Sequence, residues 1–143
     1  MNRINPGAML AWTALVVVSA GSLRAEERMR AGLWESAMTS DGKAGLATTR
    51  CVTPAEIETT NGSAKMIREY REKVAAKGGK KACTLKDLSV TSDTITAGMD
   101  CGASSFVNKT TYHGDSFETV ITFTDPAAGK KTVITGRRIG ACP

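Results

Sequence analysis

The chain has 143 residues, 41% of them apolar and 23% charged, with a net charge of +5. This length leaves room for one domain of ordinary size, and the apolar content is too high for a disordered chain. The single histidine, His113, excludes histidine-rich metal sites and most histidine relays.

Residues 1–25 predict a cleaved signal peptide. Arg3 supplies a positive start, residues 8–20 form a mostly apolar run, and Ala25 ends the segment with a small side chain. The run is shorter than the roughly 20 residues of a membrane-spanning helix. We expect cleavage after Ala25, with Ala20 as the second choice, which leaves residues 26–143 as a single disulfide-stabilised α+β domain without a membrane anchor. Loss of the leader lowers the positive charge, and the remaining excess is too small to indicate nucleic acid binding.

After a charged lead-in at residues 26–31, residues 33–38 and 45–51 predict two short strands around the turn at residues 40–43. The sequence Thr53-Pro54-Ala55-Glu56 then predicts a helix start, since Thr53 can cap and Glu56 completes a capping box.

A second helix is predicted from Ser63 to about Lys77, after an interruption at Asn61-Gly62. Ile67, Tyr70 and Val74 fall on one face of this helix, and charged pairs such as Lys65/Glu69 and Arg68/Glu72 fall on its solvent side.

From residue 82 onward the apolar pattern changes to a period of two. Residues 94–101, 106–112, 116–124 and 132–139 alternate as half-buried strands, with turn residues between neighbours. Short connections indicate hairpins and therefore an antiparallel sheet. The predicted fold class is α+β: an antiparallel β-meander of about seven strands, forming a curved sheet or partial barrel, with a helical insertion between the second and third strands and two disulfides.

Four cysteines, Cys51, Cys83, Cys101 and Cys142, predict two disulfides in an exported chain. The nearest two are too far apart for the close pairs of a zinc ribbon or a thioredoxin-like site. Three pairings are open, and we favour Cys51–Cys83 with Cys101–Cys142, which would staple the helical insertion and tie down the C-terminus.

No motif for a nucleophilic elbow, a phosphate loop, a dinucleotide site or a zinc helix is present in the sequence. His113 lies in the turn His113-Gly114-Asp115-Ser116, where four consecutive residues rarely form a catalytic triad. We therefore expect no catalytic residue, cofactor or metal. Arg137 and Arg138 interrupt an apolar strand, so one of them should need a carboxylate partner or guard an edge; they are the candidate contacts for an anion or a partner.

Several segments together resemble a known family. They are Gly32-Leu33-Trp34-Glu35, Cys51-Val52-Thr53-Pro54, Cys101-Gly102, the run from Tyr112 to Phe117 and the end from Gly136 to Pro143. Their order is similar to that of a family of bacterial exported proteins, domain of unknown function 3617. The resemblance implies a location in the periplasm of a Gram-negative bacterium and a structural role for the cysteines, and it carries no catalytic residue.

The missing catalytic signatures favour a periplasmic, non-catalytic binding or interaction module for a small apolar molecule or an envelope component. One alternative is a structural envelope protein without a pocket. The other is a hydrolase that uses carboxylates and arginines which the sequence does not pair.

Overall fold

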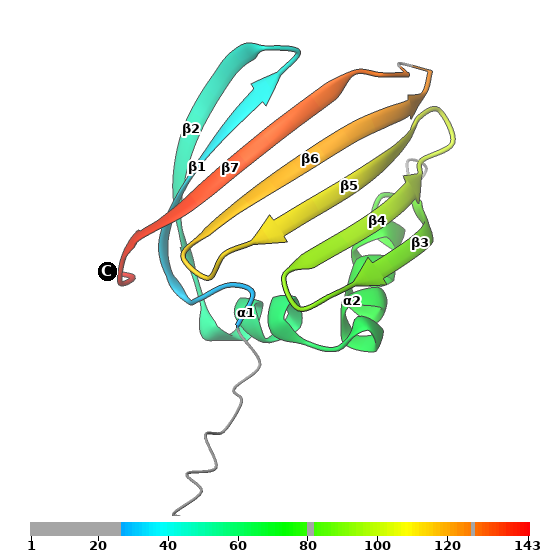
Figure 1. Ribbon diagram of the computed structural model, residues 1–143. Helices are drawn as coiled ribbons and strands as arrows, with labels where there is room; N and C mark the ends of the chain where they lie inside the picture. Colours follow the sequence, from blue (N-terminus) through cyan, green and yellow to red (C-terminus); the bar gives the residue numbers. More distant parts are fainter. Residues whose placement is uncertain (1–26, 80–81, 127) are drawn as a thin grey trace, which may run out of the picture.

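The computed structural model describes residues 27–79, 82–126 and 128–143 (Figure 1), so the predicted signal peptide lies outside the described residues. The elements in chain order are β1 (Gly32–Ser40), β2 (Lys43–Val52), α1 (Pro54–Asn61), α2 (Ala64–Ala76), β3 (Thr84–Val90), β4 (Thr94–Asp100), β5 (Ser105–Tyr112), β6 (Ser116–Asp125) and β7 (Lys131–Gly140). The mostly β architecture with helices between β2 and β3 confirms the predicted class.

All seven strands join one antiparallel sheet in the order β2-β1-β7-β6-β5-β4-β3. The helical insertion predicted between the second and third strands separates β2 from β3, and these two strands are the edges of the sheet, an arrangement that the sequence did not predict. The two helices carry the chain from one edge to the other across one face (Figure 1), and β1 pairs with β7 instead. The edges do not pair with each other, so the sheet is open.

Both helices begin where their caps predict. The Thr53 side chain accepts a hydrogen bond from the backbone of Glu56, whose carboxylate accepts one from the backbone N–H of Thr53. The Ser63 side chain caps α2 by accepting a hydrogen bond from the backbone N–H of Met66. Each cap supplies an acceptor for a backbone N–H group that has no partner within the helix, and such a cap typically stabilises the folded protein by about 1 kcal/mol.

The largest fully buried side chains are Trp34 on β1 and Ile95 on β4. The indole of Trp34 lies 5.7 Å from the ring of Phe117, and its Nε1 donates a 2.9 Å hydrogen bond to the carbonyl of Arg30. Phe117 lies over Gly136 on the neighbouring strand, where any Cβ would run into its ring. The glycine thus makes the space that lets an aromatic cluster form in a chain with few aromatic residues.

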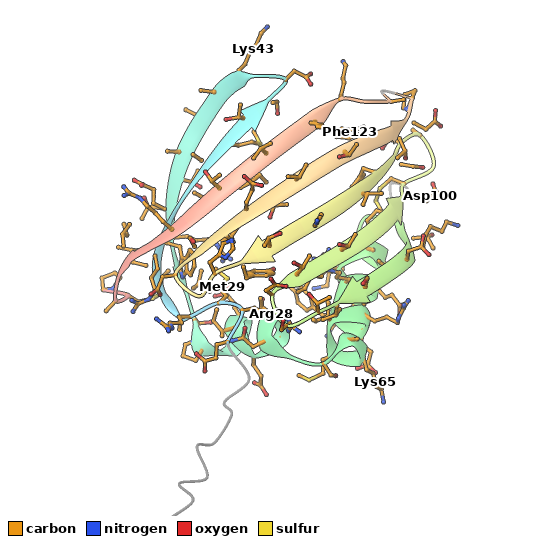
Figure 2. All side chains as sticks on the ribbon, in the orientation of Figure 1. Arg28, Met29, Lys43, Lys65, Asp100 and Phe123 are labelled. Carbon is orange, nitrogen blue, oxygen red and sulfur yellow. A yellow bond between two sulfur atoms is a disulfide. The ribbon has the colours of Figure 1, made fainter. Side chains whose placement is uncertain are left out.

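Residues 27–31 of the lead-in, which the sequence predicted only as charged, contribute to packing. Met29 is buried against Trp34 and Val52, and Figure 2 shows it together with Arg28 near α1. The Arg28 guanidinium donates hydrogen bonds to the carbonyl oxygens of Thr60 in the last turn of α1, of Gly62 just after α1, and of Thr91 before β4. Arg28 therefore links the helices to the sheet.

The disulfides are Cys51–Cys142 and Cys83–Cys101, so the favoured pairing was wrong. Leu33 of β1 pairs with Cys51 on one side and Gly140 on the other, so the chain after β7 crosses the start of β1 to reach Cys51. Cys83 precedes β3 and Cys101 follows β4, at the same end of that hairpin. The β1–β7 pairing, which the sequence did not reveal, thus decides Cys51–Cys142, and the β3–β4 hairpin decides Cys83–Cys101.

Candidate functional site

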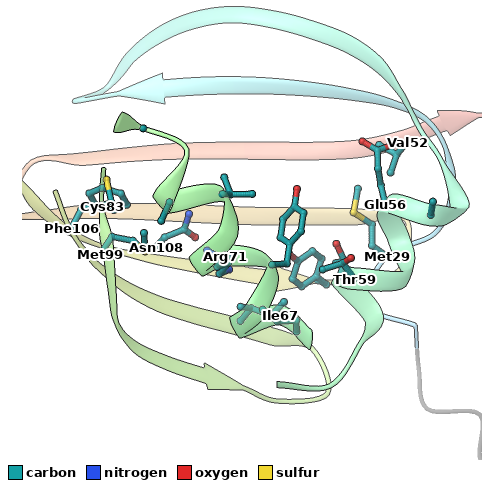
Figure 3. A pocket seen from close by; sticks show the side chains of 18 of the residues that line it. Met29, Val52, Glu56, Thr59, Ile67, Arg71, Cys83, Met99, Phe106 and Asn108 are labelled. Atoms are coloured by element: carbon teal, nitrogen blue, oxygen red, sulfur yellow. The ribbon is translucent and has the colours of Figure 1, made fainter. Parts of the chain in front are cut away.

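A cavity of about 740 Å³ lies between the two helices and the sheet (Figure 3). Its floor is the sheet face that carries Ile95, Met99 and Phe106, and its roof is formed by α1 and α2. In Figure 3, Cys83, Met99 and Phe106 lie at one end, and Met29, Val52 and Glu56 at the other. The volume falls in the range of about 300–1,000 Å³ typical of small-molecule sites.

The apolar face predicted for α2 borders this cavity rather than a filled core. Ile67 is buried, but Tyr70 and Val74 remain 54% and 49% exposed although both line the cavity. Ala75 lines it as well. Tyr70 and Val74 are exposed because the cavity separates this part of α2 from the sheet. Their apolar surface is therefore not covered by other side chains.

Arg71 also lines the cavity, and the sequence analysis did not single it out. It follows the buried Ile67 by four positions and precedes Ala75 by four, so it belongs to the sheet-facing side of α2. Among the described residues, no carboxylate lies within ion-pair distance of its guanidinium. The signal that could have found Arg71 is the helical spacing itself, since an arginine occupies a position that the period assigns to an apolar residue.

Polar side chains of β5 lie beneath this arginine. Asn108, Thr110 and Tyr112 alternate along one face of the strand, and the Thr110 hydroxyl donates a 3.2 Å hydrogen bond to Asn108 Oδ1. The hydroxyls of Thr110 and Thr119 are 2.9 Å apart. Burial raises the pKa of Tyr112, and the charge of nearby Arg71 opposes that rise. The cavity floor therefore carries a hydroxyl that remains a proton donor, close to a cation.

At the other end of the cavity, Arg50 and Glu56 form an ion pair of 2.7 Å. The backbone N–H of Thr53, the Arg50 guanidinium and the Thr53 hydroxyl lower the pKa of Glu56 to about 2. Among the described residues, Glu56 is the one carboxylate that lines the cavity, and its oxygens already serve the cap of α1 and the ion pair with Arg50.

The Glu56 interactions predict a change of stability at low pH. A carboxylate whose folded pKa lies below the unfolded value of about 4.3 stabilises fully above that value and loses this contribution as pH falls toward the folded pKa of about 2. We expect the free energy of unfolding to fall more steeply between pH 4.5 and 2 in the unchanged protein than in Glu56→Gln, measured by urea denaturation. Glu58→Gln in the same helix is the matched control and should follow the unchanged protein; coincident curves for all three would contradict the assignment.

The residues proposed as anion contacts lie elsewhere. Arg137 pairs with Glu35, its neighbour across the β1–β7 ladder, at 2.8 Å, and Arg138 donates to the carbonyl of Ala31. β7 is an interior strand, so neither arginine guards an edge. Arg138 also lies over Gly32, where a Cβ would approach its Nε to 2.5 Å. The structure thus gives both arginines partners within the sheet and does not bring either of them to the cavity.

His113 lies exposed in the turn between β5 and β6, as predicted. Its backbone N–H donates to Ser116, and Gly114 has a φ of 74°, a conformation that glycine adopts at little cost. Gly114 also bridges to Met29, so this turn holds the N-terminal segment in place.

Across residues 27–79, 82–126 and 128–143, no three histidine, cysteine or acidic side chains are arranged to hold a metal ion. No helix in the same ranges is long and apolar enough to span a bilayer.

A comparison with protein families finds a match over residues 29–142 to the model described as protein of unknown function (DUF3617). The match includes all four cysteines, both helices and all seven strands. No curated protein and no solved structure matches the chain.

Proposed function

Starting from a chain that belongs to the DUF3617 family, we propose that it is a non-catalytic binding module for a small, largely apolar molecule. The observation that carries this proposal is the cavity between the helices and the sheet, with its mainly aliphatic and aromatic lining. Burial of apolar ligand surface contributes about 25 cal/mol per Å² removed from water. The half-exposed Tyr70 and Val74 would be covered by such a ligand.

Export to the periplasm is part of the proposal, as is a curved sheet whose helix-covered face holds the ligand. Two disulfides support an oxidising location, where such bonds persist.

The two alternatives have less support. A structural protein without a pocket would be expected to fill the space under α2. A hydrolase would be expected to bring at least two acidic groups together, whereas the lining of the cavity has Glu56 alone, held by Thr53 and Arg50.

A bulky residue at Ala75 is expected to block binding. Ala75 lines the cavity, whereas the next residue, Ala76, is exposed and does not. We expect Ala75→Trp to reduce binding of an uncharged fluorescent apolar probe, N-phenyl-1-naphthylamine, at least tenfold by filling the cavity. The matched control Ala76→Trp should bind as the unchanged protein does.

Circular dichroism of both variants checks that the fold is retained, and mass spectrometry of molecules released on denaturation identifies what copurifies. Equal probe binding by Ala75→Trp and Ala76→Trp, with no copurifying molecule, would refute the proposed function.

A further inference from the structure

Resting on that proposed function, we infer that the ligand is an amphipathic anion, with a carboxylate held at Arg71 and an acyl chain along the apolar part of the cavity. The inference depends on a charged side chain without an ion-pair partner among the described residues, in a mainly apolar cavity whose other two charged side chains, Arg50 and Glu56, pair with each other. Arg71 lies within the sheet-facing side of α2, and Figure 3 shows it between the two ends of the cavity.

The guanidinium of the partly buried Arg71 requires a hydrogen-bond acceptor, preferably an anionic one. A charge that is partly removed from water costs free energy unless it is paired and hydrogen-bonded. In the part of the chain that the structure describes, every ion pair is formed by an arginine or lysine other than Arg71. Glu56, the carboxylate at the other end of the cavity, pairs with Arg50. A ligand carboxylate would give Arg71 two parallel N–H···O bonds, the geometry that guanidinium favours.

The groups around Arg71 are suited to the same headgroup. Tyr112 is close enough for the two side chains to interact electrostatically, and its hydroxyl remains protonated because burial disfavours the phenolate. Asn108 uses its Oδ1 to accept from Thr110, which leaves its amide N–H groups to donate. Arg71, Tyr112 and Asn108 are thus three donors that line one cavity, an arrangement that favours an anion over a cation.

The acyl chain has a continuous apolar path from this point. Met99 and Phe106 lie on adjacent strands as direct partners in the β4–β5 ladder, and they line the cavity on the Cys83 side. Val74 faces the same space from one turn further along α2. Arg71 lies in the middle of the cavity, and Met99 and Phe106 lie at its apolar end. This arrangement fits an elongated amphiphile better than a compact polar metabolite.

The test uses the protein produced from the full sequence and stripped of bound lipid. The probes are 11-(dansylamino)undecanoic acid and its methyl ester, which share the same chain and fluorophore but differ in the charge of the headgroup and by one methyl group. We expect the acid to bind at least tenfold more tightly than the ester, because the ester lacks the charge that pairs with the guanidinium.

The variant Arg71→Gln should lose at least tenfold in affinity for the acid while its affinity for the ester stays unchanged. Arg71→Lys keeps the positive charge and should recover part of the loss. The matched control is Arg68→Gln on the same helix, since Arg68 lies on the solvent side, 3.6 Å from Glu72; it should bind both probes as the unchanged protein does.

Equal affinity of the unchanged protein for acid and ester would overturn the inference while leaving the proposed function intact. So would an Arg71→Gln variant that matches Arg68→Gln with both probes. Failure of both probes to bind would instead refute the proposed function and the inference with it.

Discussion

Replacing both Cys51 and Cys142 by serine is expected to lower the free energy of unfolding by about 4.6 kcal/mol. The bond spans 91 residues, and in the chain-entropy model the stabilisation grows with the length of the loop that is closed. The Cys83–Cys101 bond spans 18 residues and should contribute about 3.2 kcal/mol. Against a typical total of about 5–15 kcal/mol, the first loss alone removes between about a third and nearly all of the free energy of unfolding.

Double-mutant cycles check the pairing as well as the magnitude. Cys51→Ser and Cys142→Ser should destabilise equally, and the double variant should lose little more than either, because a single bond is removed. Losses from Cys51→Ser and Cys83→Ser should instead add. Additive losses at Cys51 and Cys142, measured by urea denaturation, would contradict the pairing.

Replacing Trp34 by alanine is expected to cost about 3–5 kcal/mol, the range for deletion of a large core aromatic side chain. Trp34 is 1% exposed and lies against Phe117, which itself lies between Trp34 and Tyr112. Its loss would leave a cavity in the small aromatic cluster and leave the carbonyl of Arg30 without its indole partner.

Leu46 provides the matched control for this change. It is an equally apolar residue on the adjacent strand β2 but is 85% exposed, so Leu46→Ala should change stability by no more than about 0.5 kcal/mol. Thermal melts followed by circular dichroism measure both variants. A loss below about 1 kcal/mol for Trp34→Ala would show that this cluster is not the centre of the core.

The sequence by itself determined the local structure. Apart from β3, for which no range was predicted, the strand and helix positions followed from side-chain periodicity and from caps such as Thr53 and Ser63, whose hydrogen bonds reach only three residues along the chain. The exposed turn at His113 followed in the same way from the Gly114-Asp115 dipeptide. Such features depend on interactions between residues close together in the chain, so they can be predicted from a single sequence.

Strand order and the site depended on contacts between distant residues. Pairing of β1 with β7 joins residues about a hundred positions apart, such as Glu35 and Arg137, and it brings Cys142 to Cys51, a disulfide that the sequence left open. The same pairing gave Arg137 a partner in the sheet. Arg71 became a candidate ligand contact only when the helices were placed over the sheet. Periodicity shows which side of a helix a residue occupies. Only the packing of the helix against the sheet decides whether that side meets a filled core or a cavity.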